Sequence, residues 1–62
     1  MPAIIVEGIP LSLDQKRDLV AALTKSASSI MNVPEQSFQV YIKENSRENI
    51  GVAGILVSDR NK

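Results

Sequence analysis

The order of segments in this sequence constrains its fold more than any other feature. A short apolar segment at residues 1–8 is followed by a well-marked helix, and residues 37–43 then alternate between apolar and polar side chains. Such alternation is typical of a strand with one apolar face. Strand, helix and strand joined by short loops predict a β-α-β unit, with parallel strands and a right-handed crossover.

The central helix has clear signals at both ends. Ser12 and Gln15 match a capping box, which predicts that the helix begins at Leu13. Asn32 is suited to the left-handed C-cap conformation, so the helix is expected to end near Met31. Leu19 and Ala22 lie beside the predicted buried stripe, whose members recur at the helical period: Leu13, Val20, Leu23, Ala27, Ile30 and Met31.

Two strands and one helix leave one face of the sheet uncovered. Parallel sheets are found almost only where both faces are covered. A chain of 62 residues also has a small core, and this one has no Cys or His for disulfides or structural zinc. We therefore expect other copies of the chain to cover the remaining face and edge.

The C-terminal quarter is predicted to form a hairpin or arm. A polar loop at residues 44–49 precedes an apolar run from Ile50 to Val57, which contains Gly51 and Gly54. A phosphate-binding loop is the alternative, disfavoured because the Walker pattern is absent and no helix follows. Residues 58–62 are expected to be a frayed polar tail. The whole of 1–62 is expected to be one domain.

Composition argues against several classes of function. Seven basic and seven acidic residues are interspersed, and only two residues are aromatic, which disfavours nucleic acid as a partner. Without His or Cys, the common nucleophile triads and most transition-metal sites are excluded. No cofactor is expected. The apolar runs are too short to span a membrane and the N-terminus lacks signal-peptide features, so we expect a cytoplasmic protein.

Pro2 is the residue best suited to chemistry. A small second residue usually allows Met1 to be removed, and the new terminus would then be a free prolyl amine on a rigid ring. On position alone, an ordinary strand starter is the favoured interpretation, because the missing N–H of Pro2 costs no ladder hydrogen bond there. Both interpretations stay open at the level of the residues.

The order and spacing of these pieces resemble the 4-oxalocrotonate tautomerase family. The resemblance runs from Pro2 to about Ser58 and rests on Pro2, Glu7-Gly8, Asp14-Gln15-Lys16, Glu44 and Gly51-Val52-Ala53-Gly54. It implies an α+β fold of β-α-β subunits with a C-terminal hairpin, assembled as a homohexamer that is a trimer of dimers. It also implies an isomerase in which the Pro2 amine is the general base for keto–enol proton transfer on a small carbonyl acid.

The chain departs from that family at the substrate-binding positions. The best-known members carry an arginine before the helix, another on the second strand and a phenylalanine near the hairpin. These fall here at Leu11 (or Ile9, depending on the alignment), at Gln39 and at Ile50. The resemblance therefore implies a catalytic role for Pro2, with a substrate that is less anionic or differently held.

Neutral side chains are the remaining candidates for substrate binding. We predict that Ser37, Gln39 and Tyr41 offer hydrogen bonds and that Ile50 shapes the pocket, although each is also explained as ordinary surface or packing. Charge from a neighbouring chain has three candidate sources: Arg17, Lys43 and Arg47. An α-amine has an ordinary pKa of about 7.7–8.0, and apolar neighbours such as Ala3, Ile4 and Ile50 are expected to lower it.

Three other functions are compatible with these residues. The same amine can attack an aldehyde or ketone as a nucleophile and form an iminium ion. A related proline-dependent hydratase or dehalogenase is a second alternative. The third is a non-catalytic oligomer that keeps the fold for small-ligand binding or assembly, which the missing arginines favour.

Overall fold

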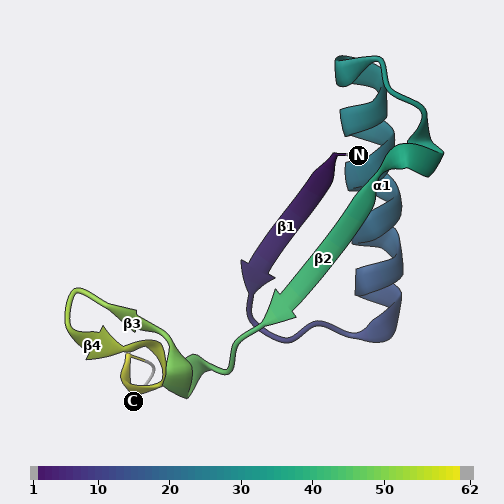
Figure 1. Ribbon diagram of the computed structural model, residues 1–62. Helices are drawn as coiled ribbons and strands as arrows, with labels where there is room; N and C mark the ends of the chain where they lie inside the picture. Colours follow the sequence, from purple (N-terminus) through teal and green to yellow (C-terminus); the bar gives the residue numbers. More distant parts are fainter. Residues whose placement is uncertain (1, 61–62) are drawn as a thin grey trace.

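The computed structural model describes residues 2–60 and consists of a β-α-β unit followed by a hairpin (Figure 1). Strand β1 (Ala3–Gly8) leads into helix α1 (Leu13–Met31), and the chain returns as strand β2 (Gln39–Glu44). The two strands pair in parallel, with Ile5 opposite Tyr41. The predicted α+β class and the parallel pairing are confirmed. The predicted start of the first strand at Met1 lies outside the described residues.

Both ends of α1 are capped as predicted. The Ser12 hydroxyl accepts a hydrogen bond from the Gln15 N–H at 3.2 Å, and the Gln15 side chain accepts one from the Ser12 N–H at 2.9 Å. At the other end, Asn32 adopts φ 59° and ψ 46°, and its N–H donates to the Ser28 carbonyl. These local bonds satisfy backbone groups that a helix otherwise leaves without partners.

One row of α1 residues is half-buried, and it differs from the predicted stripe. The row consists of Lys16, Leu19, Val20, Leu23, Thr24, Ala27 and Ser28. The prediction was wrong for Leu13, Ile30 and Met31, which are 62%, 84% and 53% exposed. A 19-residue helix is about 28 Å long, whereas a six-residue strand is about 20 Å long. The end turns therefore have no sheet beneath them.

The second strand begins later than predicted. Alternation suggested a strand over 37–43, but β2 spans Gln39–Glu44 and the preceding Glu35–Ser37 forms a 3-10 helix, η1. The Ser37 N–H donates to the Pro34 carbonyl at 3.0 Å. This hydrogen bond belongs to the turn of η1, so Ser37 lies before the strand. In the sequence, however, Ser37 is part of the alternating pattern.

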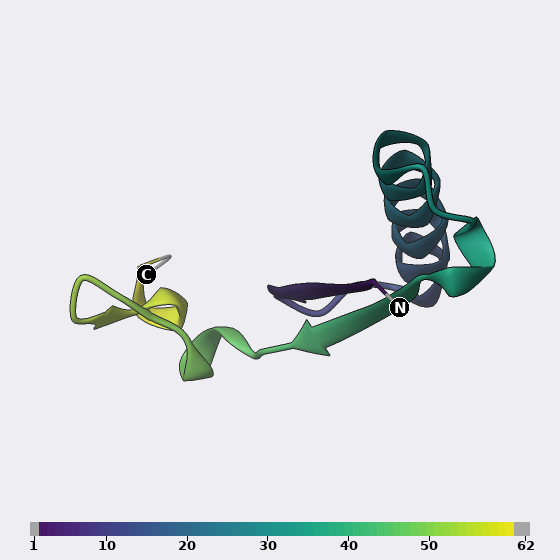
Figure 2. The same ribbon diagram turned by 45° about the horizontal axis from the view of Figure 1, so that its top comes forward.

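The predicted C-terminal hairpin is confirmed. After a short 3-10 helix, η2 (Arg47–Asn49), strands β3 (Gly51–Val52) and β4 (Ile55–Leu56) pair antiparallel. The two turn residues have φ 55° at Ala53 and 81° at Gly54, which is the pattern of a type I′ turn. Figures 1 and 2 show that the hairpin lies beyond the carboxyl end of β2, away from the β-α-β unit.

The chain does not fray directly after the hairpin. Val57–Asp59 forms a third 3-10 helix, η3. The Val57 N–H donates to the Ile50 carbonyl at 2.8 Å, and the Arg60 guanidinium donates to the Val52 carbonyl at 2.9 Å. These bonds fold residues 57–60 back onto the hairpin, in contrast to the frayed tail expected from the sequence. The remainder of that predicted tail, 61–62, lies outside the described residues.

A single chain buries little of its apolar surface. Over residues 2–60 no side chain is fully buried, and the sheet residues that face α1 are half-buried: Ile4, Val6, Val40 and Ile42. The accessible surface is 4812 Å², against about 3,950 Å² for a compact monomer of this mass. The radius of gyration is 14.9 Å, against about 10.6 Å for a compact chain of this length. An isolated chain therefore exposes apolar surface that a compact monomer buries.

Candidate functional site

The sheet has one face that α1 leaves uncovered (Figure 2). Because side chains alternate along a strand, this uncovered face is formed by Ala3, Ile5 and Glu7 from β1 and Gln39, Tyr41 and Lys43 from β2. Ile5 is 58% exposed and lies opposite Tyr41, which is 50% exposed. The face thus combines an apolar residue with side chains that form hydrogen bonds.

Pro2 immediately precedes β1, at the end of the sheet where both strands begin. It is half-buried, and its carbonyl oxygen accepts a hydrogen bond from the Gln39 N–H at 3.1 Å. The structure thus brings together Pro2 and Gln39, two of the residues that the sequence analysis selected. The predicted removal of Met1 concerns a residue outside the described range.

Gln39 and Tyr41 form a hydrogen-bonded pair on the uncovered face. The Tyr41 hydroxyl donates to the Gln39 Oε1 at 2.9 Å. A primary amide has one oxygen acceptor and two N–H donors. With its oxygen bound to Tyr41, the Gln39 amide has its NH₂ group as the end that can donate to another molecule. Gln39 and Tyr41 are two residues apart on one strand and therefore lie on the same face of the sheet. The alternating sequence already predicted this.

The other two predicted site residues lie elsewhere. Ser37 is half-buried in η1, two residues before β2 begins. Ile50 follows η2, and its N–H donates to the Arg47 carbonyl at 3.4 Å. Figure 1 shows the hairpin beyond the carboxyl end of β2, whereas Pro2 precedes the opposite end of the sheet. A pocket that contains both Pro2 and Ile50 therefore requires more than one chain.

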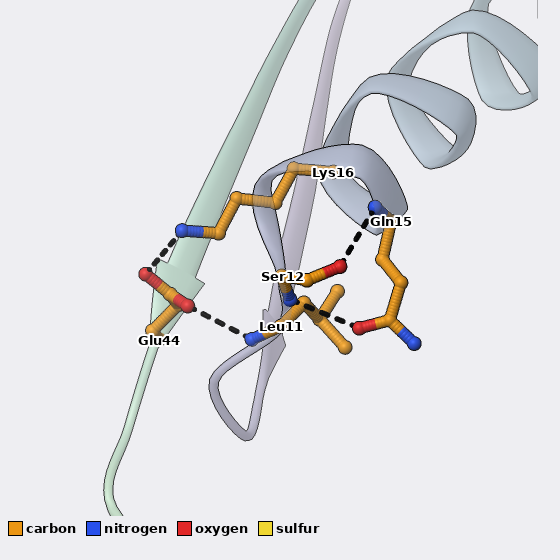
Figure 3. A network of polar contacts seen from close by, with 5 residues as sticks. All are labelled: Leu11, Ser12, Gln15, Lys16 and Glu44. Carbon is orange, nitrogen blue, oxygen red and sulfur yellow. Dashed lines mark hydrogen bonds and ion pairs between the residues drawn. The ribbon is translucent and has the colours of Figure 1, made fainter.

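A polar network fixes the loop that precedes α1 (Figure 3). The Lys16 ammonium lies 2.8 Å from Glu44 Oε1, and the Leu11 N–H donates to Glu44 Oε2 at 3.0 Å. The hydrogen bond from Lys16, followed by that from Leu11, lowers the pKa of the Glu44 carboxyl below its usual value. Leu11 and Ile9 are the two alternative positions at which the resemblance noted above would place an arginine, and this network fixes the backbone at Leu11 without supplying a free cation.

This network was not predicted from the sequence. Glu44 was assigned to a polar loop, although it continues the helix-facing row of β2 after Val40 and Ile42. Its place in the alternating pattern could have predicted that Glu44 faces the helix. Its two partners lie 28 and 33 residues away in sequence, and only the folded chain identifies them.

Residues 2–60 contain no group of three or more Asp or Glu side chains placed to hold a metal ion. The same residues enclose no pocket within one chain. None of the helices formed between residues 2 and 60 is long and apolar enough to cross a membrane.

Comparison with known families and structures gives clear matches. The sequence profile of a family described as "Tautomerase enzyme" matches residues 2–60. DmpI from Archaeoglobus fulgidus is 36% identical, with a TM-score of 0.89 over 94% of this chain and 100% of that chain. The unfused 4-OT, solved in its apo form, is 32% identical, with a TM-score of 0.90 over 95% of this chain and 98% of that chain.

A third similar structure comes from work on the 4-oxalocrotonate tautomerase isozymes of Methylibium petroleiphilum. It is 28% identical, with a TM-score of 0.91 over 97% of this chain and 95% of that chain. Comparison with curated protein sequences gives no significant match. The structural matches extend over nearly the whole chain, including the hairpin.

Proposed function

The chain belongs to the tautomerase family, and from that premise we propose that it is an isomerase whose Pro2 amine is the general base. The proposed reaction is keto–enol proton transfer on a small carbonyl acid. The observation that carries this proposal is the position of Pro2. Its carbonyl accepts a hydrogen bond from the Gln39 N–H, which holds the residue that would carry the amine at the end of the sheet, against the backbone of β2.

The proposed proton transfer needs no group beyond a neutral amine and a hydrogen-bond donor. The Pro2 nitrogen lone pair takes a proton from the carbon next to the carbonyl. The C–H electron pair forms a C=C bond, and the carbonyl oxygen becomes an enolate. The prolinium then returns the proton to another carbon, which leaves atoms and charge in balance. An α-amine with a pKa near or below its usual value of about 7.7–8.0 is suited to this task at neutral pH.

We further propose that the active assembly is a homohexamer, a trimer of dimers, in the cytoplasm. Exposed apolar side chains support an assembly, because a lone chain leaves Ile5, Ile55 and Ile30 at 58%, 50% and 84% exposure. Within the assembly, the hairpin of one copy covers the uncovered face of another. Ile50 of that copy then shapes the pocket, while Gln39, Tyr41 and Ser37 bind the substrate by neutral hydrogen bonds.

A non-catalytic, ligand-binding oligomer is the second candidate. The observation that favours it is the absence of basic side chains at Leu11 (or Ile9) and at Gln39, the positions where the resemblance places the arginines that bind carboxylates in the best-known tautomerases. A hydratase or dehalogenase that uses the same proline is a further alternative. Borohydride trapping with an aldehyde tests nucleophilic use of the amine, since an iminium ion is reduced to a stable adduct on Pro2.

Substitution of Pro2 tests the proposal against these alternatives. With phenylenolpyruvate as substrate, Pro2→Ala is expected to lower kcat/KM by about 10²-fold, because a flexible primary amine replaces the rigid base. Pro10→Ala is the matched control, since Pro10 is exposed in the loop before α1. Equal turnover by the wild type and Pro2→Ala would show that a different residue is the base. A wild type without turnover would instead favour the non-catalytic, ligand-binding oligomer.

A further inference from the structure

We propose that residues 57–60 form a latch, which holds the β3–β4 hairpin in the shape with which it covers a second copy of the chain, and that Arg60 is its positioning residue. The inference rests on the proposed function, in which the hairpin of one copy covers the uncovered face of another. It adds a role for residues 57–60, which act on the site of the neighbouring copy without touching the substrate.

The hairpin is too small to hold its shape alone. Strands β3 and β4 have two residues each, and an isolated two-stranded hairpin is marginally stable at best. Its turn has Ala53 at φ 55°, a left-handed conformation that is unfavourable for a residue with a Cβ atom. Figures 1 and 2 show the hairpin away from the β-α-β unit, which leaves the adjacent 3-10 helices to support it.

The latch supplies this support through hydrogen bonds to β3 and to itself. The Val57 N–H donates to the Ile50 carbonyl at 2.8 Å, just before β3 begins. The Arg60 guanidinium donates to the carbonyl of Val52, the last residue of β3, at 2.9 Å. The Arg60 N–H donates to the Val57 carbonyl at 3.2 Å, which closes η3. The latch thus holds the chain before β3 and at its end.

The same bonds fix Ile50, the residue assigned above to the pocket of the neighbouring copy. The Ile50 N–H donates to the Arg47 carbonyl at 3.4 Å, and its carbonyl accepts from Val57. Both backbone groups of Ile50 are therefore bonded within residues 47–57. A segment that is already ordered in the free chain loses less conformational entropy when it docks. We expect the latch to favour assembly and to set the direction in which Ile50 meets the neighbouring site.

Arg60 closes the latch with its side chain. The guanidinium is always charged, and hydrogen bonds from charged donors are stronger than those from neutral ones. Lysine keeps the charge and a donor, whereas alanine keeps neither. Arg60→Lys is therefore expected to retain much of the effect that Arg60→Ala removes.

The concentration dependence of assembly tests the latch. The protein concentration at which the light-scattering mass falls by half is expected to rise about tenfold for Arg60→Ala and less than about threefold for Arg60→Lys, because a loosened hairpin docks at a higher entropic cost. Lys25→Ala is the matched control, since Lys25 is exposed on α1 and its loss removes the same charge. Arg60→Ala that assembles like Lys25→Ala would overturn the proposal.

A second substitution at the turn separates a latch from a direct contact between Arg60 and another copy. Asn-Gly is a preferred pair for a type I′ turn, so Ala53→Asn strengthens the hairpin by another route. If Arg60 acts by holding the hairpin, Arg60→Ala should change assembly by less than about twofold in the Ala53→Asn background. The full tenfold loss in that background would overturn the positioning role.

Mixed assemblies test whether the latch of one chain acts on the site of another. Arg60→Ala chains keep Pro2, and Pro2→Ala chains keep the latch. When the two are refolded together, turnover of phenylenolpyruvate per chain that contains Pro2 is expected to exceed that of Arg60→Ala refolded alone. The reason is that intact hairpins then cover sites that contain Pro2. Equal turnover, with Pro2→Ala itself inactive, would overturn action between copies.

Amide hydrogen exchange distinguishes failure of this inference from failure of the proposed function, because it needs no turnover. The Val57 N–H of the wild type is expected to exchange more slowly than an amide without a hydrogen bond, and about fivefold faster in Arg60→Ala than in the wild type. An unprotected Val57 N–H in the wild type would overturn the latch, even if Arg60→Ala failed to fold. Full turnover of Pro2→Ala with a protected Val57 N–H would refute the proline base and support the latch.

Discussion

The two faces of the β1–β2 sheet have opposite residue patterns. The helix-facing side carries aliphatic residues and ends in Glu44, which binds Lys16 and the Leu11 N–H. The uncovered face mixes exposed Ile5 with the Gln39–Tyr41 pair. The first pattern is ordinary packing of a helix on a sheet. The second mixes exposed apolar and hydrogen-bonding side chains, and it is the face for which we proposed contact with other copies and ligand binding.

Adjacent residues of β1 allow a direct comparison of these faces. Val6 faces α1 and is half-buried, so Val6→Asp places a charge against the helix, at a cost of about 2–4 kcal/mol. In a chain of this size, that loss is expected to abolish most of the folded population. The measurement is denaturant unfolding followed by circular dichroism, with Glu7→Asp on the opposite face as the control. Equal stability of the two variants would contradict the assignment of the faces.

Ile5→Asp should have a smaller effect on the fold and a specific effect on assembly. Ile5 is already 58% exposed in a single chain, so the change costs one chain little. A charge at a subunit contact opposes association, because it loses its hydration there. Light scattering is expected to give a lower mass for Ile5→Asp than for the wild type at equal concentration. An unchanged mass would indicate that this face is not a subunit contact.

The sequence predicted the features that depend on local signals. The capping residues predicted the bounds of α1, the β-α-β order predicted the parallel pairing, and the alternation in residues 37–43 predicted the two faces of β2. Prediction was wrong where tertiary geometry decides. Ile30 has the period of a core residue, but the sheet ends before it reaches that turn. The bonds of Glu44 join residues distant in sequence, and the relation of Ile50 to Pro2 depends on neighbouring chains, which local patterns do not specify.

The smallest expected effect is a change in the pH dependence of stability at Glu44. Its pKa is lowered in the folded chain, so folding favours the carboxylate. This stabilisation is present above the unfolded pKa of about 4.3 and is lost as pH falls through the lower folded pKa. Glu44→Gln should therefore lower stability at pH 7 and flatten its decline in acid. Unfolding measured from pH 7 to pH 3 checks this, with Glu7→Gln as control; matching curves for the two variants would refute the role of the network.

The intact mass of the active protein tests the central claim most directly. Catalysis by Pro2 requires a free prolyl amine, so the mass should correspond to residues 2–62, without Met1. With Met1 in place, the Pro2 nitrogen is an amide and cannot act as a base. We predict that tautomerase activity accompanies only the species that lacks Met1. Full activity in protein that retains Met1 would contradict the account.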